Sequence, residues 1–234
     1  QAARLTEELV QEESDNPVLR YWVGVVRWQL GNRIAAVQDL RQAQQLGLKT
    51  ALLHKTLGMA YYRMHQFSLF KDQMEQAAAR DPQDPQPHYR LGRYFESVQN
   101  DFERALESFE KAIELSPDHS ESVYYRGYCL EILEREEEAL RSYETAIHLS
   151  ENNQERFSWP YQGMARLLLN RNTEQALGWA RKAVELQPEL DANHLILAKI
   201  YERSGRVSEA IEELQEVVRL NPGHTAAHYI LFRL

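Results

Sequence analysis

The chain has 234 residues, of which 43% are hydrophobic and 26% are charged, so its composition excludes a protein that is disordered throughout. The net charge of −8 argues against nucleic-acid binding, which usually needs a basic face. Only 10 glycines and 8 prolines are present, which argues against an all-β fold with many tight turns and favours long helices.

Cys129 is the only cysteine, which excludes an internal disulfide and a zinc site built from cysteines. No stretch approaches the roughly 20 apolar residues of a membrane-spanning helix, so no membrane span is expected. The first residue is Gln1 rather than Met, and a signal peptide removed by processing would leave no trace in this sequence. The compartment therefore stays open between cytoplasmic and, if a signal peptide was removed, periplasmic or secreted.

Two patterns alternate along the chain. The first places His, Leu, a small residue and an aromatic at spacings of 3, 1 and 3, with clear copies from His54, His88 and His194 and weaker ones centred on Gly24, Gly127 and Gly163. The second places Ala, a large apolar residue, Ala and Pro at spacings of 4, 3 and 5, with copies from Ala36, Phe70, Ala105, Ala139, Ala176 and Ala210. Ala176 and Ala210 are 34 residues apart. Apolar residues three and four positions apart form one face of a helix, so each pair of patterns predicts a helical hairpin.

This repeat resembles the tetratricopeptide repeat, whose consensus over about 34 residues is W-x2-L-G-x2-Y, then A-x3-F, then P. The resemblance extends from Pro17 to the C-terminus and recurs six times, which makes it specific. It implies an all-α, right-handed solenoid of helix-turn-helix hairpins. Small residues let the helices approach closely at Gly58, Gly92 and Ala198. Prolines end the second helices at Pro82, Pro117, Pro188 and Pro222.

We expect six full hairpins with a partial repeat at each end. Residues 1–16 are expected to form the second helix of a preceding repeat, and residues 225–234 the first helix of a following one. The six hairpins are residues 17–50, 51–85, 86–119, 120–153, 156–190 and 191–224. No polar capping helix is recognisable, so the array is expected to be part of a longer protein.

Some positions depart from the repeat. Phe70 stands where a small residue is expected, and its ring either opens the second hairpin or is accommodated by small neighbours such as Ala77 and Ala78. The spacing between the two patterns is one residue longer in the third and fifth hairpins. This predicts one extra turn residue within 99–101 and another within 170–173.

The junction between the fourth and fifth hairpins is the largest irregularity. Residues 151–157 lack the usual proline and predict a longer loop or an extra helical turn. Ser158 is expected to cap the next helix, and Pro160 to lie in its first turn. In the fourth hairpin, Glu136–Glu138 fall at a helix start, where they complement the helix dipole, with an acidic partner-binding patch as the alternative.

No motif predicts catalysis, a metal or a cofactor. One repeat position, where the family has a large aromatic residue, holds His54, His88, His194 and His228, which indicates a packing role. His224 and His228 have a spacing that can bind a metal on a helix, but no carboxylate completes the set. HExxH, P-loop, GxSxG and GxGxxG motifs are all absent from the sequence. Cys129 is expected to be a buried apolar residue rather than a reactive thiol.

The resemblance also implies a binding surface, because first helices in that family line a concave groove that binds peptides. Carried over position by position, the expected groove residues are Tyr21, Trp28, Lys55, Met59, Tyr62, Arg63, Tyr89, Arg93, Tyr124 and Tyr128. Tyrosine and arginine are enriched at interface hot spots, although several of these tyrosines could instead pack between neighbouring first helices. Some family members clamp a carboxylate with asparagines and basic residues. The positions where those asparagines are expected hold Val25, Met59 and Arg93 in this chain. That clamp is therefore absent, which leaves Lys55, Arg63 and Arg93 to hold a carboxylate in another way.

The sequence thus predicts a non-enzymatic scaffold or adaptor that binds a peptide or protein segment. Two alternatives stay open: an assembly module that self-associates through its solenoid ends, and the recruiting arm of a larger enzyme. RNA binding is disfavoured because residues 86–153 carry 15 acidic and 7 basic side chains. The identity of the partner cannot be read from the sequence.

Overall fold

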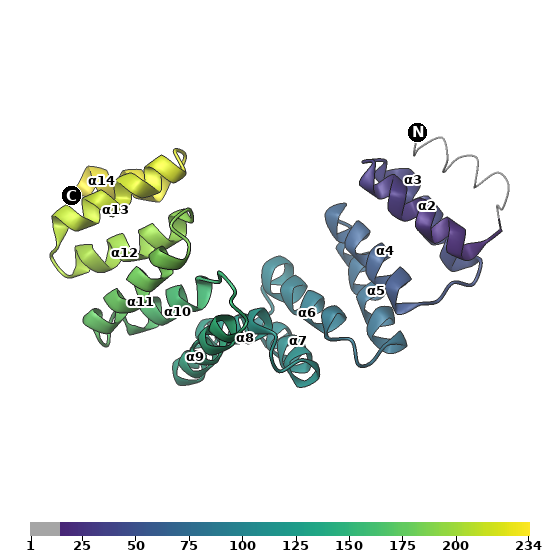
Figure 1. Cartoon of the computed structure of the whole chain (residues 1–234), viewed down its shortest axis with the longest axis horizontal. Helices are drawn as coiled ribbons and strands as arrows, with labels where there is room; N and C mark the ends of the chain where they lie inside the picture. The colour runs from purple at the N-terminus through teal and green to yellow at the C-terminus, as the bar shows by residue number, and fades with distance from the viewer. Residues whose placement is uncertain (1–14) are drawn as a thin grey trace. The chain divides into compact units, whose positions relative to one another are not determined.

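The computed structural model describes residues 15–234, and all regular secondary structure in that range is helical (Figure 1). The helices are α2 (Pro17–Gln29), α3 (Arg33–Gln45), α4 (Ala51–Arg63), α5 (Phe67–Arg80), α6 (Pro85–Tyr94), η1 (Phe95–Gln99), α7 (Phe102–Leu115), α8 (Ser120–Ile132), α9 (Glu136–Asn152), α10 (Trp159–Leu168), α11 (Thr173–Leu186), α12 (Asp191–Arg203), α13 (Val207–Leu220) and α14 (Thr225–Arg233). The predicted all-α helical-repeat fold is confirmed. The helix expected over residues 1–16 falls almost entirely outside the described residues.

The chain divides into two compact units, Gln1–Asn100 and Asp101–Leu234. Helices α2 to α6 and η1 belong to the first unit, and α7 to α14 to the second. The division falls between the two helices of the third expected hairpin. The six hairpin ranges therefore remain a proposal about the repeats rather than a description of folding units.

Three-residue turns join α2 to α3, α4 to α5, α8 to α9 and α12 to α13. The middle residue of each turn has a positive φ: Gly31 (83°), His65 (58°), Glu134 (59°) and Gly205 (74°). This left-handed region costs a residue with a Cβ roughly 1–2 kcal/mol, which glycine avoids. Since the same turn forms with and without glycine, the packing of the two helices determines it rather than the turn residue.

The third and fifth hairpins each contain one residue more than the other hairpins between the two sequence patterns, and the structure accommodates these two residues in different ways. Between α10 and α11 the turn has four residues, 169–172, close to the predicted position. In the third hairpin the predicted extra turn residue at 99–101 is wrong. The extra residue lies within the helix, where Phe95–Gln99 form the π-helix η1, in which a wider turn absorbs one residue. The Gln99 side-chain amide donates a hydrogen bond to the Tyr94 hydroxyl at 2.7 Å.

The junction after the fourth hairpin contains both an extra helical turn and a loop. Helix α9 has 17 residues, against 13 or 14 in the other second helices, and the loop 153–158 follows it. Pro160 lies in the first turn of α10, as predicted. The prediction that Ser158 caps α10 is wrong, because its side chain makes no capping hydrogen bond. Its hydroxyl instead donates to the Gln187 side chain at 2.6 Å.

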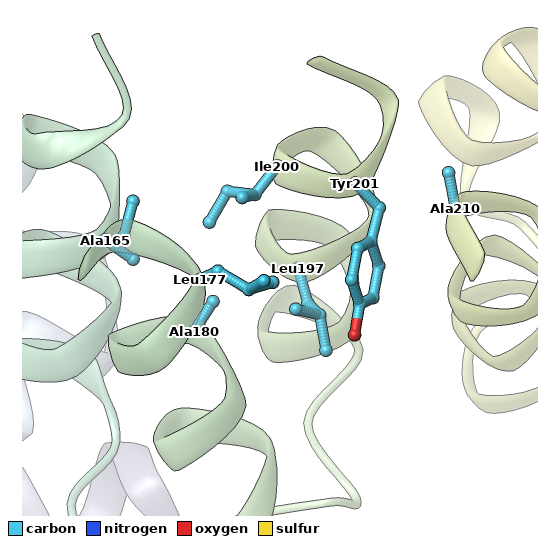
Figure 2. Close-up of a cluster of buried hydrophobic side chains, with 8 residues drawn as sticks. Ala165, Leu177, Ala180, Leu197, Ile200, Tyr201 and Ala210 are labelled. Carbon is cyan, nitrogen blue, oxygen red and sulfur yellow. The ribbon is translucent and has the colours of Figure 1, made fainter. Parts of the chain in front are cut away.

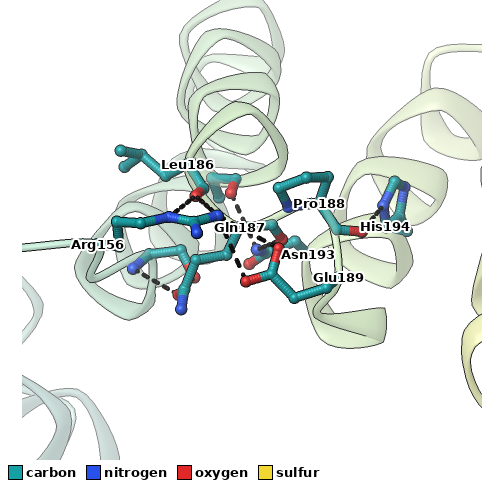
Figure 3. A network of polar contacts seen from close by, with 9 residues as sticks. Arg156, Leu186, Gln187, Pro188, Glu189, Asn193 and His194 are labelled. Atoms are coloured by element: carbon teal, nitrogen blue, oxygen red, sulfur yellow. Dashed lines mark hydrogen bonds and ion pairs between the residues drawn. The ribbon is translucent and has the colours of Figure 1, made fainter.

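Polar side chains tie this junction to the end of α11 (Figure 3). The Arg156 guanidinium donates to the Leu186 carbonyl at 3.1 and 2.9 Å and reaches the Glu189 carboxylate at 3.4 Å. The buried Asn193 side chain donates to the carbonyls of Ala183 at 2.9 Å and Gln187 at 2.8 Å. These bonds satisfy carbonyls that a helix C-terminus leaves without internal partners.

The core of the second unit forms where small residues let successive helices approach. One cluster, in Figure 2, combines residues from four helices, α10 to α13: Ala165, Ala176, Leu177, Ala180, Leu197, Ile200, Tyr201 and Ala210. All eight are buried. The alanines are the small residues of the sequence pattern, and their burial is consistent with the close helix packing that the pattern predicts.

Tyr143 on α9 is fully buried and lies between two glycines. A Cβ added to Gly163 on α10 would come within 2.5 Å of its ring, and one added to Gly127 on α8 within 2.9 Å. The Tyr143 hydroxyl donates to the Glu131 carboxylate at 2.6 Å, which also accepts from Arg166 at 2.5 and 2.6 Å. Burial raises the pKa of the Tyr143 phenol, so the hydroxyl remains a donor at neutral pH. One ring thus joins three consecutive helices.

Candidate functional site

A cleft of about 220 Å³ in the first unit brings together three of the predicted groove residues. Met59 and Tyr62 from α4 and Arg93 from α6 line it, together with Phe70 from α5 and Arg90 from α6. We name it the arginine–tyrosine cleft.

The floor of the arginine–tyrosine cleft is aromatic. Phe70 is 1% exposed, and its ring centre lies 5.1 Å from that of Tyr62 and 5.5 Å from that of Tyr94. Aromatic neighbours therefore accommodate the ring. The hairpin is not opened at Gly58, where an added Cβ would lie 3.3 Å from the Gln73 Cβ. The ring is thus buried rather than forcing the hairpin open, and the part assigned to Ala77 and Ala78 in accommodating it stays a prediction.

The rim of the cleft carries cationic and hydroxyl groups. Arg90 is exposed, stacks over the Tyr89 ring at 5.4 Å and forms no ion pair with any residue from 15 to 234. The Arg93 Nε donates to Glu96 at 3.3 Å. The Tyr62 hydroxyl has no hydrogen-bond partner within the described part of the chain. A carboxylate is the group that best complements this rim, because guanidinium groups bind it with charge-assisted hydrogen bonds.

Arg90 lines the cleft but was not among the predicted groove residues. The signal was present, since Arg90 precedes Arg93 by three residues and residues three apart on a helix are neighbours on its surface.

Three other predicted residues of the first unit lie apart from this cleft. The Lys55 ammonium donates to Asp84 at 2.5 Å, so its charge is already paired. Arg63 is exposed and lines a different cleft, near the hairpin turns. Trp28 is half-buried, with the guanidinium of Arg33 5.9 Å from its ring centre.

Two predicted tyrosines are almost fully buried, Tyr21 at 7% and Tyr89 at 6% exposure. The Tyr21 hydroxyl lies 3.2 Å from the Thr56 hydroxyl, within hydrogen-bonding distance. For these two residues the geometry favours packing between first helices, the alternative that the sequence left open. We leave both out of the proposed site.

In the second unit, Tyr124 belongs to an aromatic cluster at the junction. Its ring centre lies 4.9 Å from Tyr125, 5.8 Å from Tyr143, 5.5 Å from Phe157 and 5.7 Å from Trp159. The half-buried Tyr128 lies 6.3 Å from Phe102. Packing accounts for most of the surface of Tyr124.

The packing role predicted for the histidine position of the repeat fits His54 and His194 but not His228, which is exposed. His54 and His194 are buried, and the Nδ1 atom of each contacts a side chain 19 residues further on, Gln73 at 2.9 Å and Glu213 at 2.6 Å. The described residues contain no group of three His, Cys, Asp or Glu side chains that could hold a metal ion. Within residues 15–234 no helix is both long and apolar enough to cross a bilayer.

Comparison with known proteins places these features in a family. Residues 96–154 and 191–234 each match a model of the tetratricopeptide repeat. The BBSome complex member BBS4 of Bos taurus is 30% identical over 92 residues, which span 39% of this chain and 17% of that protein. These two segments therefore contain tetratricopeptide repeats, and the other hairpins of the described chain have the same helical architecture. Tetratricopeptide repeats generally act as protein–protein interaction scaffolds rather than as enzymes.

Solved structures show the same fold. The C-terminal part of a TPR repeat-containing protein from Cytophaga hutchinsonii superposes with a TM-score of 0.73 at 17% identity, covering 97% of this chain and 92% of that one. The APC/C hetero-tetramer Cut9-Hcn1 gives a TM-score of 0.76 at 14% identity, covering 99% of this chain and 45% of that one. At these identities the likeness concerns the fold alone.

Proposed function

We propose that this chain binds an extended segment of a partner protein along the first helices α4 and α6, with a carboxylate of that segment at Arg90 and Arg93. The observation that carries the proposal is the Arg90 guanidinium, which forms no ion pair within residues 15–234 and lies beside the apolar floor of the arginine–tyrosine cleft. A ligand that matches both features carries an acidic side chain, or a C-terminal carboxylate, next to a small apolar side chain.

The expected contribution of Arg90 follows from its chemistry. A hydrogen bond between charged groups contributes about 1.5–3 kcal/mol. Arg90→Ala is therefore expected to weaken the affinity for the partner by about 10- to 100-fold. Met59 and Phe70 offer an apolar surface for the neighbouring side chain. The Tyr62 hydroxyl can donate a further hydrogen bond to the carboxylate or to the backbone of the segment.

Affinity capture with the 234-residue chain tests the proposal. A Tyr62→Ala/Arg90→Ala/Arg93→Ala variant is compared with an Arg80→Ala/Arg141→Ala variant, which removes two exposed arginines elsewhere. Partners identified by mass spectrometry are expected to be lost only with the cleft variant. The same partners on all three proteins would contradict binding at this cleft.

Self-association is the second candidate function. It is supported by Tyr229 and Phe232 on α14, which are 64% and 92% exposed. Light scattering across a range of concentrations is expected to detect a dimer that Phe232→Ser dissociates. A wild-type protein that stays monomeric at every concentration would contradict this candidate.

A further inference from the structure

A second, larger cleft lies in the other unit, between two second helices of consecutive hairpins. Its volume is about 630 Å³. Helices α9 and α11 form its walls and both pack against α10, which provides its floor. The apolar side chains that face it include Leu140, Met164, Leu168 and Trp179. We name it the α9–α11 cleft; it shares no residue with the arginine–tyrosine cleft.

Gly178 lines the α9–α11 cleft. It lies in the interior of α11, where glycine destabilises a helix relative to alanine. Gly178 is exposed, its φ is not positive, and an added Cβ would meet no heavy atom within 4 Å. Neither the backbone nor packing therefore requires glycine here. What the missing side chain preserves is space at the cleft wall, which is the usual reason for glycine where another molecule approaches the backbone.

The charges around the cleft are asymmetric. Glu144 and Glu151 on the α9 wall are exposed, and neither forms an ion pair within the described chain. Glu151 accepts a hydrogen bond from the Tyr161 hydroxyl at 2.8 Å. On the opposite wall, Lys182 is already paired with Glu185 at 3.2 Å. An apolar floor beside two uncompensated carboxylates complements a ligand that is apolar on one face and basic beside it.

The spacing of the two carboxylates indicates the shape of that ligand. Glu144 and Glu151 are seven residues apart, which is two helical turns or about 10 Å along α9. Basic residues two turns apart on another helix have the same separation. A groove between two helices, with an apolar floor, is also the kind of surface that binds an amphipathic helix.

We propose that the α9–α11 cleft is a docking groove for a basic amphipathic helix of a partner protein. Apolar side chains of that helix lie over Met164 and Leu168, its backbone passes Gly178, and its lysines or arginines pair with Glu144 and Glu151. The chain then has two separate binding surfaces, one for an acidic segment and one for a basic helix.

The test uses a fluorescein-labelled model peptide made only of leucine and lysine, with leucines spaced to form one helix face. Fluorescence anisotropy with the full 234-residue chain is expected to show saturable binding in the micromolar range. Gly178→Leu fills the cleft and is expected to weaken binding at least about tenfold. Ala226→Leu, which adds an exposed leucine on α14, is the matched control and is expected to leave binding unchanged.

A Glu144→Gln/Glu151→Gln variant tests the charges separately and is also expected to weaken binding about tenfold, more so at low salt. A peptide with glutamate in place of lysine is expected not to bind. Circular dichroism is expected to show that all variants keep wild-type helicity. The proposal is overturned if Gly178→Leu binds like the wild type, if the acidic peptide binds equally well, or if sedimentation shows a wild-type dimer that Gly178→Leu dissociates.

Discussion

Replacing Gly163 by alanine should destabilise the second unit because of the ring of Tyr143. The added methyl carbon would lie 2.5 Å from ring atom Cε2 and 2.6 Å from Cζ. The ring cannot move away, since Gly127 lies against its other edge and the hydroxyl is held by Glu131 at 2.6 Å. The methyl group must therefore separate α9 from α10.

The magnitude follows from two opposing effects. Carbon atoms pack at about 3.5–4.0 Å, so the methyl group overlaps the ring by about 1 Å. Overpacking of this kind costs about 1–3 kcal/mol, and a ring confined on both sides belongs to the upper part of that range. Alanine stabilises a helix interior by about 1 kcal/mol over glycine. The net expectation is a destabilisation of about 2 kcal/mol.

Gly178→Ala is the matched control, since it makes the same substitution in the next helix, α11. An added Cβ there meets no heavy atom within 4 Å, so only the helix propensity changes. This variant is expected to be more stable than the wild type by about 1 kcal/mol. The two identical substitutions should thus have opposite signs.

Urea unfolding followed by far-UV circular dichroism measures both effects. With a slope of about 2 kcal/mol per molar urea, Gly163→Ala lowers the midpoint by about 1 M. In a Tyr143→Leu background its cost should shrink by more than about 1 kcal/mol, because a smaller side chain leaves room for the methyl group. If Gly163→Ala is neutral, or costs the same with leucine at position 143, the steric argument is refuted.

Three further predictions concern buried charges and the turns. The hydrogen bond to Glu213 raises the pKa of His194 above its usual value, so the pair stabilises the fold below about pH 6.5 and loses this effect as pH rises through the raised pKa. Urea unfolding as a function of pH should show that decline, and Glu213→Gln should remove it. Glu134→Gly relieves a left-handed backbone at φ 59° and should raise the free energy of unfolding by up to about 1 kcal/mol; a less stable variant would show that the turn is not strained. The Asp39 side chain is 4% exposed, and its carboxylate accepts from Arg20 at 3.2 Å and from Arg27 at 2.5 Å. Asp39→Ala should therefore destabilise the first unit by about 3–5 kcal/mol in thermal unfolding. A loss of stability under about 1 kcal/mol would contradict a buried ionic network.

Much of the fold could be predicted from the sequence because it depends on spacing alone. Alanine and proline at fixed intervals mark where the second helices pack and end, and α5, α7, α11 and α13 all stop two residues before a proline. The sequence pattern does not show where within a hairpin an inserted residue lies. An extra residue anywhere between two anchors gives the same count, so the sequence could not distinguish a longer turn from the π-helix at Phe95–Gln99.

The site was predicted less completely, because consensus positions say which helix face a residue occupies and not which neighbours it meets. Met59, Tyr62 and Arg93 line one cleft, but Lys55 pairs with Asp84, 29 residues away. The contact of Gly163 with Tyr143 likewise crosses from one expected hairpin to the next. The α9–α11 cleft was not foreseen, since residues of three helices from two expected hairpins line it.

Site-specific photo-crosslinking is the most direct test of the central claim that a partner segment binds in the arginine–tyrosine cleft. A photoreactive amino acid replaces Met59 in the cleft or, as the control, Leu69, an exposed residue on α5. Binding in this cleft predicts that the partner crosslinks from position 59 and not from position 69, and that Arg90→Ala removes the crosslink. Crosslinking from position 69 alone, or from position 59 regardless of Arg90, would contradict it.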